Sequence, residues 1–124
     1  MPAVRYFVSD VDRSLEFYKL FGFDLVEKWG PAIAIVERDG VQLWLSGPTS
    51  SAAKPMPDGR NPEPGGWNRM VVLTQDFEGL VAELKASGTT FRNEPLAGPG
   101  GTQVLIEDPD GNPIELFSSN QMKQ

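Results

Sequence analysis

The sequence contains neither cysteine nor histidine among its 124 residues. The absence of cysteine excludes disulfides, thiolate metal sites and a thiol nucleophile. The absence of histidine removes the usual general base and a frequent metal ligand. Any catalytic role would therefore have to be built on carboxylates or other side chains.

Long apolar runs are also missing, and the first residues, MPAVRYFVSD, lack the basic and apolar segments of a signal peptide. We therefore expect a cytoplasmic protein that does not enter a membrane. The hydrophobic content of 40% suits one compact domain or two small modules that share a core. The formal net charge of -6 argues against nucleic acid as a partner and favours a cationic ligand if the charge lines a cleft, but it also fits a role in solubility alone.

What the sequence does contain is an internal repeat. Asp10 is followed by apolar residues at helical spacing and then by a glycine, and Asp76, 66 positions later, is followed by the same pattern. Each half predicts an amphipathic helix of about three turns, with aspartate as N-cap and glycine closing the C-terminus. The matching positions are Val11, Leu15, Tyr18 and Gly22 in the first half and Phe77, Val81, Leu84 and Gly88 in the second.

A strand is expected before each helix, at Val4–Val8 and Arg69–Leu73, and further strands that end in a hairpin are expected after it. Asp39-Gly40 predicts the first hairpin turn, because this dipeptide tolerates the positive φ angles of a type I′ turn. The sequence DPDG at positions 108–111 is its counterpart. The segment Ser46–Gly66, which mixes proline with serine, glycine and asparagine, is either a functional loop or a plain tether.

The stretch EDPDGNPIELF, which ends at Phe117, places one carboxylate in an otherwise apolar strand. In an alternating strand Ile114 and Leu116 point to one face, while Glu115 and Phe117 point to the other. A carboxylate in such a place is either solvated at an open face or held by a metal, a cation or a ligand.

Three segments, VRYFVSDVDRSLEFYKLFGF, WNRMVVLTQDFEGLVAELKASGT and EDPDGNPIELF, together resemble the vicinal oxygen chelate superfamily. This superfamily includes glyoxalase I, extradiol dioxygenases, fosfomycin-modifying enzymes and bleomycin-binding resistance proteins. The resemblance implies an α+β fold with curved mixed sheets, made of two βαβββ modules at about 1–48 and 67–120 and a linker at about 49–66. It also implies a homodimer with a pocket between modules of different subunits, although pairing of the two modules within one chain is topologically allowed.

In metal-dependent members of the superfamily, four side chains on these strands bind one divalent ion. The repeat places the four positions at Ala3, Trp44, Arg69 and Glu115, and only the last can be a ligand. Methyl and indole groups lack a usable lone pair, and a guanidinium cation repels a divalent ion. We therefore expect no metal and no cofactor, and with them no metal-dependent glyoxalase I or dioxygenase reaction.

In place of the ion, we expect a bidentate ion pair between Arg69 and Glu115, either as a plug in a former metal site or as a group that faces a ligand. Trp44 and Phe7 could stack on a planar ligand, and Trp67 could close over it, whereas core packing is the alternative for each aromatic ring. By alternation and resemblance, the expected ligand-binding residues are Arg5, Phe7, Gln42, Trp44, Trp67, Arg69, Glu115 and Phe117.

Three hypotheses for function remain at this point. The leading one is a metal-independent protein that binds and sequesters a planar or cationic, antibiotic-like small molecule, as the bleomycin-resistance group does. The alternative is a metal-independent, glyoxalase-like lyase or isomerase with Glu115 as its base, because no other candidate base is expected in the pocket. The third is a subunit that binds another protein through its convex face.

Overall fold

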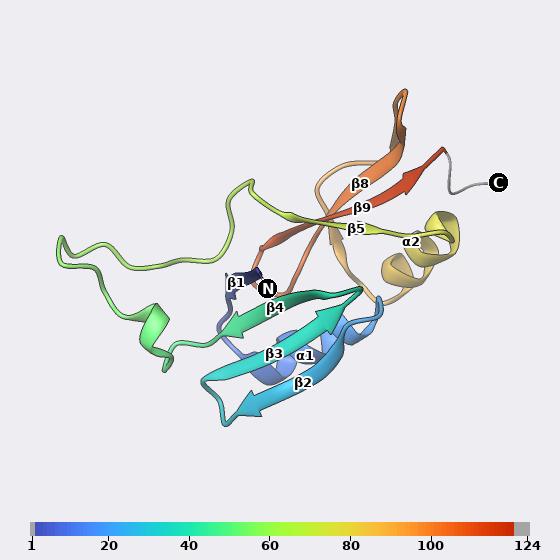
Figure 1. Ribbon diagram of the computed structural model, residues 1–124. Helices are drawn as coiled ribbons and strands as arrows, with labels where there is room; N and C mark the ends of the chain where they lie inside the picture. The colour runs from blue at the N-terminus through green and yellow to red at the C-terminus, as the bar shows by residue number, and fades with distance from the viewer. Residues whose placement is uncertain (1, 121–124) are drawn as a thin grey trace. The chain divides into compact units, whose positions relative to one another are not determined.

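The computed structural model describes residues 2–120, which form two compact units that divide between Gly65 and Gly66. Each unit has one α-helix and one mixed β-sheet (Figure 1), so the predicted α+β class is confirmed. No helix in the described part of the chain is long and apolar enough to cross a membrane.

The first unit has a four-stranded sheet in the order β1-β4-β3-β2. Strands β1 and β4 run parallel, and the other neighbours are antiparallel. The elements are β1 (Ala3–Phe7), α1 (Val11–Lys19), β2 (Asp24–Trp29), β3 (Ile33–Arg38), β4 (Val41–Ser46) and the short 3-10 helix η1 (Ser51–Ala53).

The second unit repeats this topology with one change. Its sheet has the order β5-β9-β8-β6, and β7 also pairs with β8, so β6 and β7 together take the place that β2 takes beside β3. The elements are β5 (Met70–Leu73), α2 (Phe77–Ala86), β6 (Thr90–Phe91), β7 (Leu96–Ala97), β8 (Gly101–Glu107) and β9 (Pro113–Ser119). The predicted βαβββ pattern is therefore present, with one strand interrupted.

The helix ends follow the predicted chemistry. The carboxylates of Asp10 and Asp76 accept hydrogen bonds from the backbone N–H groups of Arg13 and Gly79, each at 3.2 Å. Gly22 and Gly88, which follow the two helices, have φ angles of 92° and 81°. Both helices are thus capped by aspartate and followed by a glycine in the left-handed region.

The two predicted hairpin turns are also present. Asp39 and Gly40 join β3 to β4 with φ angles of 51° and 80°. Between β8 and β9, Asp108 Oδ1 accepts from the backbone N–H groups of Asp110 and Asn112, each at 2.9 Å. This second turn is held by a buried side chain, because Asp108 is only 4% exposed.

The core of each unit lies between the helix and one face of the sheet. In the first unit four aromatic rings pack against one another with centroids 5.1 to 5.7 Å apart, mostly edge to face. They are Phe17, Tyr18, Phe21 and Phe23. In the second unit the buried residues include Leu84, Ile106, Ile114 and Leu116. Phe17 and Tyr18 are core residues. We call the face of each sheet that lies opposite its helix the open face.

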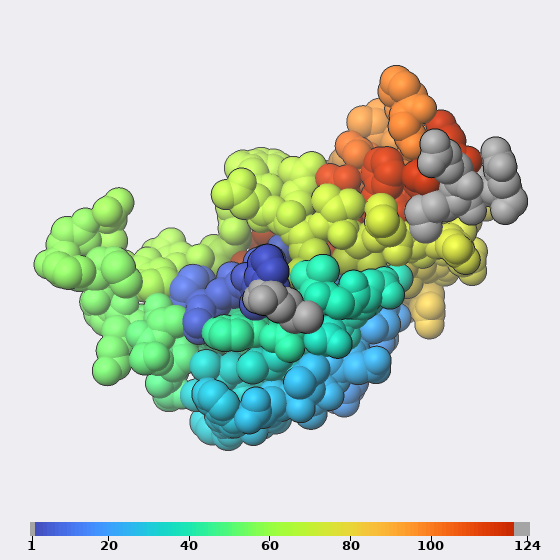
Figure 2. Space-filling model, viewed as in Figure 1, coloured from blue at the N-terminus to red at the C-terminus, as the bar shows by residue number. Residues whose placement is uncertain are grey.

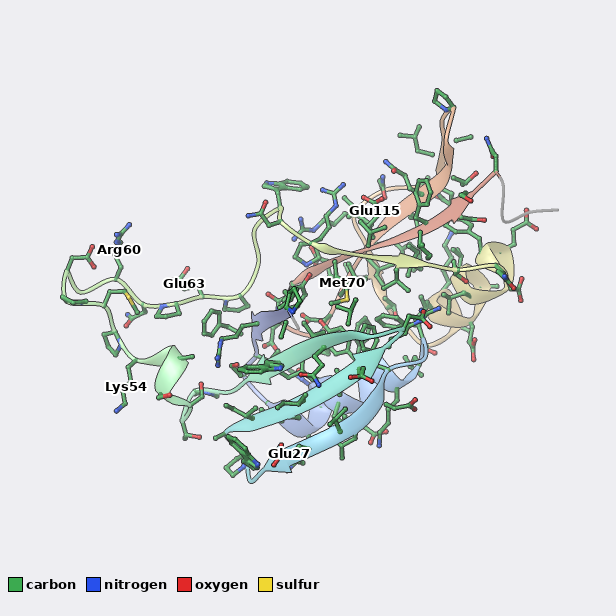
Figure 3. All side chains as sticks on the ribbon, viewed as in Figure 1. Glu27, Lys54, Arg60, Glu63, Met70 and Glu115 are labelled. Carbon is green, nitrogen blue, oxygen red and sulfur yellow. The ribbon has the colours of Figure 1, made fainter. Side chains whose placement is uncertain are left out.

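The segment that follows β4 leaves the sheet of the first unit as an extended arm (Figures 1 and 2). After η1 it contains no regular element. Lys54, Arg60 and Glu63 extend outward from this arm (Figure 3). Charged side chains and prolines therefore keep most of this segment exposed.

Candidate functional site

The open face of the first unit carries a connected set of polar and aromatic side chains. Trp44 Nε1 donates to Gln42 Oε1 at 3.1 Å, and Gln42 Nε2 donates to Glu37 Oε1 at 3.3 Å. The Arg5 guanidinium lies 5.2 Å from the centroid of the Trp44 ring and donates to Ser46 Oγ at 3.1 Å. The indole is therefore fixed at its edge by an amide and covered on one face by a cation.

The sequence analysis missed other residues on this open face. Alternation along IAIVER would have found Ile33, Ile35 and Glu37, which pair with strand β4 opposite Ser46, Trp44 and Gln42. Glu27 and Trp29, joined by a hydrogen bond of 2.7 Å from Nε1 to Oε1, are harder to find. A register shift in β2 just before Glu27 changes which residues share a face.

Phe7 lies at the end of β1, beside the arm that follows β4. It lines a cavity of about 280 Å³ together with Ser46 and residues of the arm that include Pro62 and Pro64. This part of the expected linker therefore forms one wall of a cavity.

The open face of the second unit contains the predicted ion pair. Arg69 Nε and Nη2 donate to Glu115 Oε1 at 3.1 and 2.8 Å. The side chains are 29% and 10% exposed, respectively, and Figure 3 labels Glu115 on β9. Both nitrogens meet the same oxygen, so the pair is not the expected fork across two oxygens. Within residues 2–120, Glu115 Oε2 accepts no hydrogen bond.

A second arginine, which the sequence analysis missed, organises the start of this unit. Arg92 donates to Glu107 Oε2 at 2.8 Å and to the carbonyl oxygens of Gly66 and Gly111 at 2.8 and 3.0 Å. Its guanidinium also lies 4.6 Å from the centroid of the Trp67 ring. Trp67 is 69% exposed, and its ring is in contact with this arginine. Arg92 follows a two-residue strand, where no periodic pattern could have marked it.

Phe117 lies two residues beyond Glu115 on β9, beside a glycine-rich turn. It lines a cavity of about 320 Å³ with Leu96, Gln103 and the turn Gly98–Gly101. The backbone N–H of Gly98 donates to the carbonyl of Gly101 at 2.8 Å, where the chain turns from β7 into β8.

The expected site residues thus fall into separate groups. In the first unit Arg5, Gln42 and Trp44 are in contact, and Phe7 lines the cavity beside the arm. In the second unit Arg69 contacts both Glu115 and the carbonyl oxygen of Trp67, at 2.8 and 3.3 Å. Phe117 belongs to the neighbouring cavity.

The donor set does not fit a divalent metal ion. Ala3 and Trp44 offer no lone pair, and Glu115 Oε1 already accepts two hydrogen bonds from a guanidinium. Across the part of the chain that the structure describes, no group of three or more histidine, cysteine, aspartate or glutamate side chains could hold an ion.

Comparison with known proteins agrees with this fold. The chain is 30% identical to "Lactoylglutathione lyase GLX1" of Arabidopsis thaliana, with 92% of this chain and 42% of that protein covered. It therefore spans less than half of that relative's length. A glyoxalase/bleomycin resistance protein/dioxygenase superfamily structure from Sphaerobacter thermophilus DSM 20745 matches with a TM-score of 0.74 and 29% identity, covering 94% of each chain.

A third similar structure is TnmS3, an antibiotic binding protein from Streptomyces sp. CB03234. It matches with a TM-score of 0.71 and 27% identity, over 95% of this chain and 93% of that one. The family model described as Glyoxalase/Bleomycin resistance protein/Dioxygenase superfamily matches residues 1–116. Because this match covers nearly the whole chain, the protein belongs to the glyoxalase/bleomycin resistance protein/dioxygenase superfamily.

Proposed function

We propose that this protein binds a small planar, cationic molecule without a metal ion and releases it chemically unchanged. The observation that carries the proposal is the fixed indole of Trp44, which Gln42 and Glu37 hold at its edge through hydrogen bonds of 3.1 and 3.3 Å. An aromatic surface that is already ordered loses little conformational entropy when a flat ligand stacks on it.

The charges around the indole favour a cation over an anion. Glu37 lies at the end of the hydrogen-bonded chain, and Glu27 is on a neighbouring strand of the same sheet. Arg5 covers one face of the Trp44 ring with its guanidinium 5.2 Å from the ring centroid, and this contact supports a planar cation as the ligand. A ligand cation would stack on the other face of the ring or displace Arg5.

The second unit supports binding over catalysis. Glu115, the expected catalytic base, is held by Arg69 at 2.8 Å, and the sequence has no histidine or cysteine. The similar antibiotic binding protein TnmS3 is consistent with sequestration. By this proposal, the ligand is an antibiotic-like compound and the site works in a homodimer or within one chain.

A second candidate function is a metal-independent lyase or isomerase. The observation that favours it is Glu115 Oε2, which accepts no hydrogen bond within residues 2–120 and so has room to take a proton from a substrate. The relative described as a lactoylglutathione lyase belongs to the same class, although the chain spans only 42% of it.

A panel of three ligands with similar ring systems tests the proposal by calorimetry. 9-Aminoacridine is a planar cation, 9-anthracenemethanol is neutral and 9-anthracenecarboxylate is an anion. We expect the cation to bind most tightly and the anion least tightly. Added salt should narrow the difference in affinity between them, because exposed charges are screened over about 8 Å at physiological ionic strength. Mass spectrometry of the recovered compound should show no change, whereas turnover would favour the lyase.

Two substitutions locate the binding. Trp44→Ala should lower affinity for the cation about tenfold or more, because it removes the stacking surface. Phe91→Ala is the matched control, because Phe91 pairs with the buried Ile106 on the helix side of the other sheet. Arg5→Ala should raise affinity for the cation, because it uncovers the ring and removes a like charge. A loss of affinity in Arg5→Ala, with tighter binding of the anion, would contradict the proposal.

A further inference from the structure

A cavity of about 590 Å³ lies beside α2 in the second unit, away from the open face of the sheet. Its volume falls within the range of roughly 300 to 1,000 Å³ that is typical of small-molecule sites. Ser118 lines it from β9. Because side chains alternate along β9, Ser118 shares the helix side with the buried Leu116, while Glu115 and Phe117 are on the opposite side.

Ser118 carries a polar group that nothing in the described part of the chain satisfies. The residue is 1% exposed, and its Oγ makes no hydrogen bond within residues 2–120. Buried hydroxyl groups in folded proteins nearly always have a partner, because leaving one unpaired is unfavourable. A hydroxyl without a partner at the wall of a cavity indicates a position where a ligand group can bind.

The lining residues on α2 indicate which kind of chemical group the cavity can hold. Phe77, Val81 and Ala82 of α2 line the cavity with apolar carbon atoms. Phe77 and Val81 are 7% and 8% exposed, so they are held in place by the core. This surface suits a small apolar or aromatic group.

The charges at the cavity disfavour an anionic ligand. Asp76 and Glu78 line it at the start of α2, and the Asp76 carboxylate, which caps the helix, offsets the positive end of the helix dipole. Lys85 also lines the cavity, but its Nζ lies 3.6 Å from Glu94 Oε2 and 5.4 Å from the centroid of the Phe91 ring. The acidic groups are therefore not balanced by a cation that is free of other contacts.

We propose that this cavity is a ligand site, separate from the open faces of the sheets, for a small amphipathic molecule. The ligand has an apolar body, which packs on α2, and one uncharged hydroxyl or protonated amino group, which hydrogen-bonds to Ser118 Oγ. This site does not depend on the function proposed for Trp44 and Glu115.

Nuclear magnetic resonance titration of the full chain with benzyl alcohol, benzylamine and benzoate tests the site. The first two should shift the backbone signals of α2, Thr102 and Ser118 in a saturable way, and benzoate should bind at least about threefold more weakly, since it replaces a donor with an anion. With benzyl alcohol, which carries no charge, the signals from the open face around Trp44 and Glu115 should stay unchanged.

Three variants separate the site from general effects. Ser118→Ala should weaken benzyl alcohol binding about threefold to tenfold without loss of folding, because it removes a hydroxyl that has no partner within residues 2–120. Ala82→Phe should abolish binding by filling the cavity. Ala86→Phe is the matched control, since Ala86 is exposed on the same helix and does not line the cavity.

The proposal is overturned if saturable shifts are absent from α2, or if they occur only on the open faces. It is also overturned if Ser118→Ala binds benzyl alcohol as tightly as the parent chain, or if Ala86→Phe lowers affinity as much as Ala82→Phe does. Equal or tighter binding of benzoate would refute the choice of an uncharged or cationic ligand.

Discussion

In the first unit the outer strand β2 pairs with β3 along its length, whereas in the second unit the matching partner of β8 is broken into β6 and β7. The break coincides with a change of hydrogen-bonding chemistry. The backbone N–H of Leu105 donates to the side chain of Asn93 at 2.9 Å, where a continuous strand would supply a backbone carbonyl. Pro95, which has no N–H to donate, then precedes β7.

This difference shows how one topology can support two kinds of open face. The first unit keeps a continuous strand and holds the Trp44 indole with a hydrogen bond to the neutral amide of Gln42. In the second unit the break leaves Arg92 between two short strands, where it reaches Gly66, Glu107 and Gly111 at once. Ion pairs therefore organise the second face, and loss of single side chains should be more damaging there.

The largest expected effect is that of Arg69→Ala. Glu115 is 10% exposed, so removal of the guanidinium leaves a mostly buried carboxylate without its partner. We expect the free energy of unfolding to fall by about 2 kcal/mol. This loss is below the range for fully buried pairs, because Arg69 is 29% exposed. Urea denaturation measures this change.

The double variant Arg69→Met with Glu115→Leu is the control for that experiment. It removes both charges, and most of the lost stability should return. If Arg69→Ala unfolds at the same urea concentration as the parent chain, the ion pair does not organise the second face.

Arg92→Ala should have the next largest effect and lower the free energy of unfolding by about 1 to 2 kcal/mol, because it breaks a partly buried ion pair and two hydrogen bonds to carbonyl oxygens. The emission of Trp67 should also change, because its ring loses the guanidinium at 4.6 Å. Arg60→Ala is the matched control, since the Arg60 side chain is 85% exposed on the arm, and its effect on stability should be close to zero. Equal effects of the two substitutions would remove the special role given to Arg92.

Gly40→Ala and Gly111→Ala should each lower the free energy of unfolding by about 1 kcal/mol, because both glycines have positive φ angles, which alanine adopts unfavourably. Their φ angles are 80° and 85°, and an added Cβ would meet no atom within 4 Å in either turn. The cost should therefore be similar in the two units, in contrast with the arginine variants. Thermal unfolding of the two variants measures it, and a much larger loss for Gly111→Ala would show that the buried Asp108 network depends on this residue.

The smallest expected effect is that of metal ions. We expect zinc, nickel, manganese or iron to leave the melting temperature unchanged, and elemental analysis of protein purified without chelator to find no near-stoichiometric metal. Stoichiometric metal that disappears in Glu115→Ala would contradict this expectation. The two open faces would then also differ in metal binding.

The features that the sequence predicted are those encoded by local chemistry. The repeat from Asp10 and Asp76 led to both helices and their caps, and Asp39-Gly40 led to the first hairpin. The superfamily resemblance, together with alternation along the strands, predicted that Arg69 would meet Glu115, and the parallel pairing of β5 with β9 brings the two together.

The features that it did not predict depend on irregular backbone. The register shift in β2 hid the positions of Glu27 and Trp29, and the break between β6 and β7 hid the role of Arg92. The unpaired hydroxyl of Ser118 depends on what surrounds it in three dimensions, so no pattern of residue types could have revealed it.

The ion pair between Arg69 and Glu115 also makes these two positions interdependent in evolution. A mutation at Arg69 alone leaves the Glu115 carboxylate, which is 10% exposed, without its ion-pair partner. A mutation at Glu115 alone leaves an arginine that can still turn toward water. The easier mutational path therefore changes Glu115 first. Among descendants of this chain, residues 69 and 115 should vary together. Where Arg69 has been lost, a glutamate at 115 should persist only if another cation has taken the place of the arginine.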